Sequence, residues 1–187
     1  MPPDWKTEAE AALAAEDHAA FLELARARVS RVIRFLMSRL YTEDETEKWK
    51  VIRALGAVAA SPDVLSPQRA EDLLRRFAWA LNDESGAVPY GVPEAIGEVL
   101  AVRPELQPRF LPILCALLTE EDMSQTGPIE QGALWAVGRV GRPAGRHSQA
   151  VISALRRAAT SHPDPKTRAV AAESLARISG SPLPAAR

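Results

Sequence analysis

The residues of this 187-residue chain that are best suited to covalent chemistry are few, and they form no catalytic set. His18, His147 and His162 lack the i, i+3 or i, i+4 spacing that places two ligands on one helix face, and a single cysteine, Cys115, cannot complete a closed zinc site. We therefore expect no metal and no cofactor. Catalysis by Cys115 would need a histidine brought close by the fold, so an inert helical thiol is the simpler interpretation. The chain is predicted not to be an enzyme.

Side chains suited to binding are more prominent. Tryptophan and arginine are the residue types most enriched among the energetic hot spots of protein interfaces. Two tryptophans and five arginines are the candidate partner-binding residues: Trp79, Trp135, Arg75, Arg76, Arg109, Arg156 and Arg157. The arginines occur partly as adjacent pairs, and such pairs commonly belong to a solvated helix face. They are also suited to holding an acidic protein segment or nucleic-acid phosphates.

Composition and charge narrow the classes of protein to consider. Apolar residues make up 47% and charged residues 25%, as in ordinary globular domains, and the net charge is 23 minus 24, or −1. A nucleic-acid binder usually has a strong positive excess, although residues 139–187 alone carry nine basic and two acidic side chains. The single cysteine fits a reducing compartment, so we expect a cytoplasmic protein. Residues 1–10 do not resemble a signal peptide, and no segment is apolar enough to predict a membrane span.

An internal repeat organises the chain. The pattern Ala-Leu-Gly-Ala-Val at 54–58 recurs in related form at 95–99, 136–140 and 174–178, so that its large apolar residue lies at 55, 96, 137 and 175. A second series places Leu74, Leu114 and Leu155 between these copies, each with apolar neighbours at helical spacing. Each unit of about 40 residues is therefore predicted to contain two helices, here called A and B.

The expected helix ends agree with this division. Thr42 and Glu45 have the spacing of a capping box, and Ser66-Pro67, Gly127-Pro128 and Asp164-Pro165 place proline at the first helical position. Positions 56, 97, 138 and 176 of the repeat hold Gly, Gly, Gly and Ala. We expect close helix-to-helix approach at these positions, because glycine in a helix otherwise costs about 1 kcal/mol relative to alanine.

The last repeat carries a family resemblance. Asp164-Pro165-Lys166-Thr167-Arg168, followed by Ala171-Ala172, Leu175 and Ile178, resembles the consensus of the HEAT-like repeats of phycobilisome-lyase-type proteins, with Ala176 where glycine is usual. The resemblance covers about residues 43–178. It implies an all-α fold, a short right-handed α-solenoid of HEAT-like helix pairs whose B helices line a concave face. Most members of the family are scaffolds for protein partners.

Two further helices are expected ahead of the repeats, at about 7–16 and 18–41. Most apolar residues of the longer helix form one stripe around Val29, but Phe21, Leu24 and Phe35 lie off it. Packing by the first helix and a homodimer contact are the two explanations. The predicted organisation is one domain over residues 1–180, with N-terminal helices at 1–42, about three and a half repeats at 43–180, and a flexible tail at 181–187.

The repeat alignment shows which positions normally face solvent. Trp135 shares its position with Arg53, Glu94 and Glu173, so an exposed side chain is expected there. Trp79 shares its position with two threonines, Thr119 and Thr160. Cys115 shares its position with Arg75 and Arg156, which leaves open whether its thiol faces outwards. Arg142, Arg146 and His147 are expected in a loop that extends the basic surface.

These features give three functional hypotheses. The first is a non-catalytic protein-binding scaffold that uses the concave face of the solenoid. The second is a nucleic-acid-binding protein, because the alkylpurine DNA glycosylases are also built from HEAT-like repeats and hold DNA in a basic groove. The third is an accessory, lyase-like role in the maturation of another protein, which depends on the family resemblance alone.

Overall fold

The computed structural model describes residues 4–82, 90–121 and 127–180, and every regular element in these ranges is a helix. The chain is therefore all-α, as predicted. It divides into two compact units, residues 1–91 and 92–187. The prediction that residues 1–180 form one domain stays a prediction, and the predicted tail at 181–187 lies outside the described residues.

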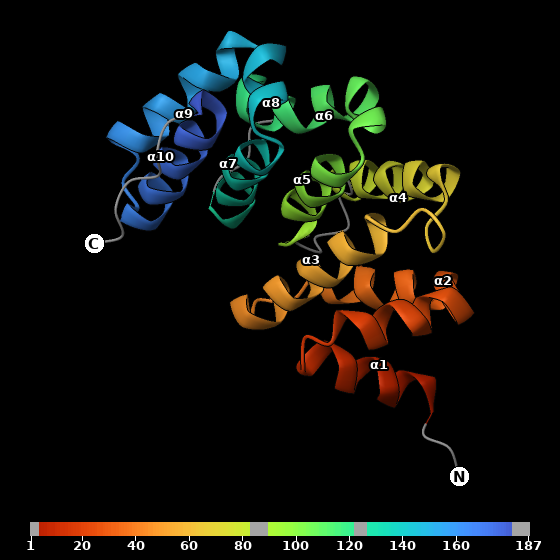
Figure 1. Ribbon diagram of the computed structural model, residues 1–187. Helices are drawn as coiled ribbons and strands as arrows, with labels where there is room; N and C mark the ends of the chain where they lie inside the picture. The colour runs from red at the N-terminus through yellow and green to blue at the C-terminus, as the bar shows by residue number, and fades with distance from the viewer. Residues whose placement is uncertain (1–3, 83–89, 122–126, 181–187) are drawn as a thin grey trace. The chain divides into compact units, whose positions relative to one another are not determined.

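The described residues of the first unit form four helices, shown in red to yellow in Figure 1. They are α1 (Trp5–Ala14), α2 (His18–Arg39), α3 (Glu45–Ala59) and α4 (Pro67–Ala80). Helix α1 packs against both α2 and α3. Leu36, Leu55, Leu74 and Phe77 are among the fully buried side chains of the unit, so α2, α3 and α4 all contribute to its core.

Helix α2 is interrupted near its middle. Arg28 has φ −149° and ψ 48°, outside the helical region, and helical geometry resumes after it. The apolar residues on either side, such as Ala25 and Val32, are nevertheless both buried. The interruption therefore leaves the inner face of α2 packed against the core.

Helix α1 covers the off-stripe aromatic residues of α2. The rings of Trp5 and Phe35 meet edge to face at 6.3 Å, and those of Phe21 and Phe35 lie 6.4 Å apart. Phe21 and Phe35 are 1% and 7% exposed, while Leu24 is half-buried. Packing within the chain thus accounts for both rings. The homodimer contact through Phe21, Leu24 and Phe35 stays a prediction.

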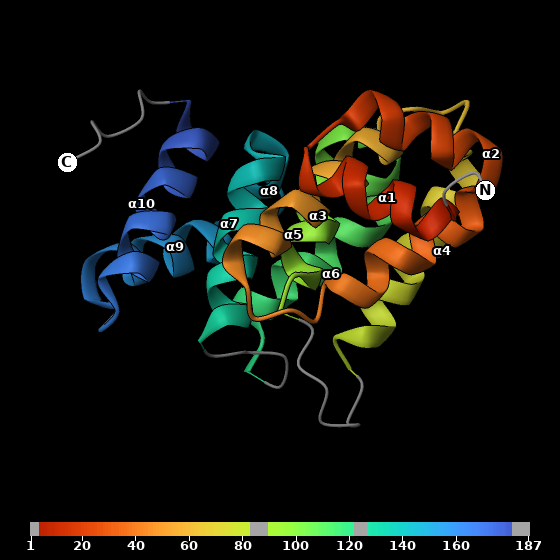
Figure 2. The same cartoon turned by 90° about the horizontal axis from the view of Figure 1, so that it is seen from below.

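The second unit stacks helices as an α-solenoid does. It comprises α5 (Val92–Val102), a 3-10 turn (Pro104–Leu106), α6 (Gln107–Thr119), α7 (Pro128–Val140), α8 (Arg142–His147), α9 (Gln149–Ser161) and α10 (Pro165–Ser179). Helix α7 packs against α5 on one side and α10 on the other, and α6 and α9 accompany them as second helices. Figure 2 shows α7, α9 and α10 from a second direction.

Repeat glycines set the spacing of these stacked helices. A Cβ added at Gly97 of α5 would lie 2.6 Å from the Cα of Ala136 in α7, and one added at Gly138 would lie 2.6 Å from the Cα of Ser174 in α10. Real side chains do not approach a backbone so closely. The predicted reason for glycine at this repeat position, close helix approach, is confirmed at both sites.

Most predicted helix starts are confirmed, and one cap was wrong. The Ser66 hydroxyl accepts a hydrogen bond from the Arg69 amide, and the Asp164 carboxylate accepts from Lys166 and Thr167. The predicted capping box of Thr42 and Glu45 does not form. Asp44 caps α3 instead and accepts from the Glu47 amide at 2.9 Å, because its carboxylate lies directly before the first helical residue.

The segment after α7 also differs from expectation. Residues 142–147, predicted as a loop, form α8, which begins directly after Gly141 at φ 77°. Ala144 is fully buried and anchors this short helix. Arg142, Arg146 and His147 remain exposed on it.

Candidate protein-binding surface

Trp79 is the most exposed large apolar side chain of the described residues. It lies near the end of α4 and is 71% exposed, whereas the next, Tyr41, is 39% exposed. The threonines that share its repeat position, Thr119 and Thr160, are also exposed. An exposed tryptophan is costly in water and is a frequent anchor of protein interfaces, so its surroundings define the candidate site.

Three polar residues of α4 lie on the same side of the helix as Trp79. Arg69, Asp72, Arg76 and Trp79 follow one another at three- and four-residue intervals, which places them within about 80° of one another around a helix. Arg75 lies beside them, but its guanidinium is already paired. It donates to Glu71 Oε1 at 2.7 Å and to Asp72 Oδ1 at 3.1 Å.

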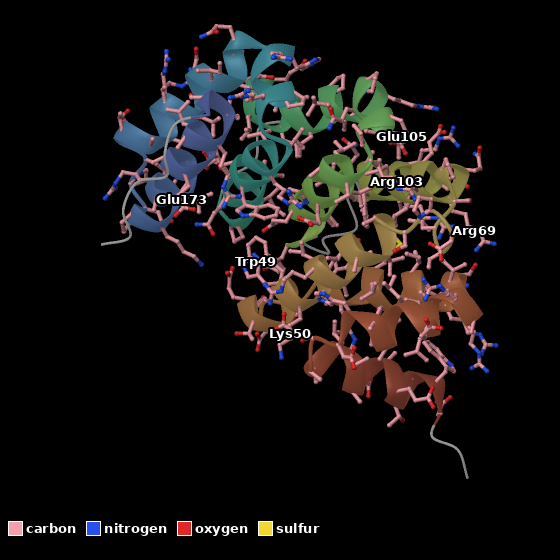
Figure 3. The ribbon with its side chains drawn as sticks, viewed as in Figure 1. Trp49, Lys50, Arg69, Arg103, Glu105 and Glu173 are labelled. Atoms are coloured by element: carbon pink, nitrogen blue, oxygen red, sulfur yellow. The ribbon has the colours of Figure 1, made fainter. Side chains whose placement is uncertain are left out.

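A groove of about 320 Å³ runs between this side of α4 and helix α2. We call it the α2–α4 groove. Its aliphatic lining comes from both helices and the turn before α4: Val29, Ile33, Leu65 and Leu73. Its polar lining consists of Ser30, Arg34, Arg69, Asp72 and Arg76. In Figure 3, Arg69 extends from the beginning of α4. Trp79 does not line the groove itself, but it follows Arg76 by three residues on α4, which is about one helical turn.

A shallow hollow continues the groove where α2 is interrupted. Its volume is about 460 Å³, and its lining consists of Ala27, Arg28, Val29, Ser30, Arg31 and Arg69. Three of these six residues are arginines and none is acidic. We call it the Arg28 hollow. It shares Val29, Ser30 and Arg69 with the α2–α4 groove, so the two form one continuous surface.

Nearby carboxylates are engaged by other arginines. Arg26 binds Asp63 through Nε at 3.0 Å and also pairs with Glu23, while Arg75 holds Glu71 and Asp72. Among the described residues, no carboxylate pairs with the five arginines of the continuous surface: Arg28, Arg31, Arg34, Arg69 and Arg76. The surface therefore carries positive charge that the fold does not neutralise.

The remaining predicted binding residues belong to the second unit and to three different helices. Arg109 of α6 and Arg156 and Arg157 of α9 are exposed, and Trp135 of α7 is half-buried. Arg157 lines a separate pocket of about 320 Å³ in this unit, together with Glu130 and His162. The structure thus brings Arg75, Arg76 and Trp79 together on α4, whereas Arg157 occupies a different surface.

The expectation of exposure at the Trp135 repeat position was wrong for Glu94. Arg53 and Glu173 are exposed there, but Glu94 is only 2% exposed. Its carboxylate occupies space that Gly132 leaves open on α7, since a Cβ at Gly132 would lie 2.7 Å from Glu94 Cδ. A glycine on the neighbouring helix therefore converts a surface position into a buried one.

Cys115 also departs from its repeat equivalents. Arg75 and Arg156 are exposed, but the Cys115 side chain is 2% exposed. Burial raises the pKa of its thiol to about 12, because the thiolate would lose its hydration. At neutral pH the group is a protonated, inert thiol, which does not suit nucleophilic chemistry.

Histidine contributes a structural contact in the second unit. The Asp164 amide donates to His162 Nδ1 at 3.1 Å, which leaves the proton on Nε2, and Nε2 lies 3.4 Å from Glu130 Oε2. This contact connects the start of α7 to the turn before α10. Within residues 4–82, 90–121 and 127–180, no three His, Cys, Asp or Glu side chains gather as a group that could hold a metal ion.

Sequence reasoning missed the contribution of α2 to the site. It found Trp79 and Arg76 through the repeat, but α2 precedes the repeats and has no aligned copy. Arg28, Arg31 and Arg34 were therefore not among the predicted binding residues. Their three-residue spacing within an otherwise amphipathic helix was the available signal. The fold shows that these arginines line the α2–α4 groove and the Arg28 hollow.

Comparisons with known proteins leave the chain without an assigned family. No family model and no curated protein matches it. Among solved structures it is similar to a designed armadillo repeat protein, YIII(Dq)4CqI, at 18% sequence identity and a TM-score of 0.47, over 86% of this chain and 74% of that one. No helix in the described part of the chain is long and apolar enough to cross a membrane.

Proposed function

We propose that this protein is a non-catalytic binding module that holds a protein partner in the α2–α4 groove of its first unit. One observation carries the proposal: Trp79, 71% exposed, lies on α4 one helical turn after Arg76, and Arg76 lines a groove with an aliphatic floor and unneutralised arginines. An apolar anchor beside such a groove can bury apolar side chains of a partner and pair with its carboxylates.

The second unit supplies the other proposed contacts. Arg109, Trp135, Arg156 and Arg157 are candidates for a secondary surface, with a smaller effect on affinity than Trp79. Trp135 is half-buried, so it offers a partner less apolar area than Trp79 does. The arginines are exposed, and exposed charges influence association rate more than affinity.

We also propose that the repeats belong to the HEAT-like class and that the protein acts in the cytoplasm. The repeated glycine contacts and the Asp164-Pro165 helix start support the first point. The second is supported by the single cysteine, Cys115, which is buried and free. A short helical repeat presents an extended surface, which suits binding to a protein segment rather than to a small molecule.

The test is affinity capture from a native lysate with three baits: the wild-type chain, Trp79→Ala and Tyr41→Ala. Quantitative mass spectrometry reads the captured proteins, and parallel samples receive nuclease. Tyr41→Ala is the matched control, because Tyr41 is the other exposed large apolar residue of the described chain. A fourth bait, Trp135→Ala, measures the secondary surface.

We expect a defined protein to be retained by the wild-type and Tyr41→Ala baits, with or without nuclease, and to fall at least tenfold with Trp79→Ala. Removing a tryptophan anchor typically weakens an interface by about 2 kcal/mol or more. Thermal melting of all four chains is expected to be equal within a few degrees. Equal capture by the wild type and Trp79→Ala would contradict the proposed site, and capture that disappears with nuclease would indicate nucleic-acid binding instead.

A further inference from the structure

We propose that the Arg28 hollow binds a phosphate group, and that the segment held in the α2–α4 groove is therefore a phosphorylated segment of the partner protein. This inference rests on the proposed function, because it specifies the chemistry of the segment in the same groove. It concerns Arg28, Arg31 and Arg69, which line the hollow.

Charge is the first argument for a phosphate. Three of the residues that line the hollow are arginines and none is acidic, and Asp63 and Glu23 are paired with Arg26. A phosphorylated serine carries about two negative charges at pH 7 and three acceptor oxygens, so it can engage two or three guanidinium groups at once. One carboxylate carries a single charge and matches one guanidinium.

Hydrogen-bonding capacity is the second argument. Ser30 also lines the hollow and is exposed, so its hydroxyl can donate to a bound oxygen. The interruption of α2 falls at Arg28, which is itself one of the residues that line the hollow. Arg28, Arg31, Ser30 and Arg69 thus form a donor-rich surface around an open space that a phosphate can enter.

A protein segment fits the adjoining surface better than a nucleic acid does. The continuous surface has an aliphatic floor of Val29, Ile33, Leu65 and Leu73, which can accept apolar side chains. The chain as a whole carries a net charge of −1, so it provides no long-range attraction for a polyanion. A protein segment with a single phosphate and flanking apolar residues suits both the aliphatic floor and the low net charge of the chain.

Helix geometry predicts the register of the bound segment. Arg69 and Trp79 are ten residues apart on α4, which corresponds to about 15 Å at 1.5 Å per residue. An extended peptide spans about 3.3 Å per residue. A phosphoserine at the Arg28 hollow therefore places an apolar residue four or five positions away against Trp79.

The experiment uses degenerate 13-residue peptide libraries with a fixed central phosphoserine, serine or glutamate, retained on the immobilised full chain. Sequencing of the retained peptides gives the preferred residue at each position. Four chains are compared: the wild type, Trp79→Ala, the double variant Arg28→Gln, Arg31→Gln, and the control double variant Arg142→Gln, Arg146→Gln. The control removes the same charge from exposed arginines of α8.

We expect the wild type and the control to retain at least ten times more phosphoserine library than serine library, with apolar residues enriched four or five positions from the phosphoserine. The Arg28→Gln, Arg31→Gln variant is expected to lose this preference to within about twofold. Inorganic phosphate at millimolar concentration should compete. Trp79→Ala should reduce retention of all three libraries.

Other results overturn the inference in distinguishable ways. Equal retention of phosphoserine and serine libraries, with dependence on Trp79, would remove the phosphate site and leave the proposed function intact. Failure to retain any library would also refute the phosphate site, and the lysate capture would then test the proposed protein binding separately. Tighter binding of a 20-nucleotide single-stranded RNA at 150 mM salt, lost in the Arg28→Gln, Arg31→Gln variant, would assign the hollow to nucleic acid.

Discussion

Two regions of the molecule, the contact between α5 and α7 and the surface between α2 and α4, differ in how their arginines are paired. In the second unit, Arg139 of α7 donates through Nε and Nη2 to both carboxylate oxygens of Glu98 in α5, at 2.7 and 3.0 Å. In the first unit, five arginines around the α2–α4 groove and the Arg28 hollow have no carboxylate partner among the described residues. A charge paired across neighbouring helices supports the fold. The proposed binding surface rests on charge that is left unneutralised beside an apolar floor.

The largest expected effect concerns the stacking of the second unit. Gly97→Leu places a side chain where the backbone of α7 already lies, since even a Cβ would be 2.6 Å from the Ala136 Cα. We expect a loss of about 3 kcal/mol in the free energy of unfolding, because the helices must move apart. Urea unfolding followed by circular dichroism measures it.

The matched control is Ala169→Leu, at an exposed position of α10. It adds the same side chain where there is room, so its effect should stay within about 0.5 kcal/mol. If Gly97→Leu were equally neutral, the close approach of α5 and α7 would be refuted.

A smaller effect is expected from the ion pair between Glu98 and Arg139. Their side chains are 14% and 36% exposed, so the pair is only partly screened by water. Glu98→Gln should cost about 1 kcal/mol in the free energy of unfolding, because a bidentate charged contact becomes a neutral one. Glu173→Gln, an exposed carboxylate, is the control and should change little. A cost that does not decrease in 1 M salt would argue against an electrostatic origin.

The smallest effect depends on pH and concerns the cap of α10. The Thr167 hydroxyl and amide donate to Asp164 and hold the pKa of this carboxyl below its ordinary value of 3.8. A lowered pKa in the folded state contributes stability that is present above pH 3.8 and is lost as pH falls through the folded-state value. The melting temperatures of the wild type and Asp164→Asn should therefore differ at pH 7, and the difference should shrink as the pH is lowered below 3.8. A difference that stays constant over this range would contradict the assignment.

Sequence reasoning captured the fold wherever the repeat supplied copies to compare. The prolines at helix starts have local causes, and the glycines at 97 and 138 recur at the spacing of the repeat, so both could be located from the sequence. The burial of Glu94 and Cys115 was not predicted, because it depends on contacts within the folded unit rather than on their own helix. The short helix α8 was not predicted either, since six residues are too few to show a helical periodicity.

The site was predictable in part, and the missing part has a clear origin. Trp79 stood out because its repeat equivalents are threonines. Arg34 and Arg69 could not be joined to it from the sequence, because they come from helices that pack together only in the fold. No glycine or proline marks the interruption of α2 at Arg28, so the sequence did not predict the hollow beside it.

One measurement tests most directly whether binding resides in the first unit. The triple variant Arg34→Gln, Arg69→Gln, Arg76→Gln is compared with the double variant Arg156→Gln, Arg157→Gln in their affinity for the captured partner or for the best phosphopeptide. We expect the groove variant to bind at least tenfold more weakly and the α9 variant to stay within about threefold of the wild type. The reverse order would contradict the assignment of binding to the α2–α4 groove and place it on the second unit.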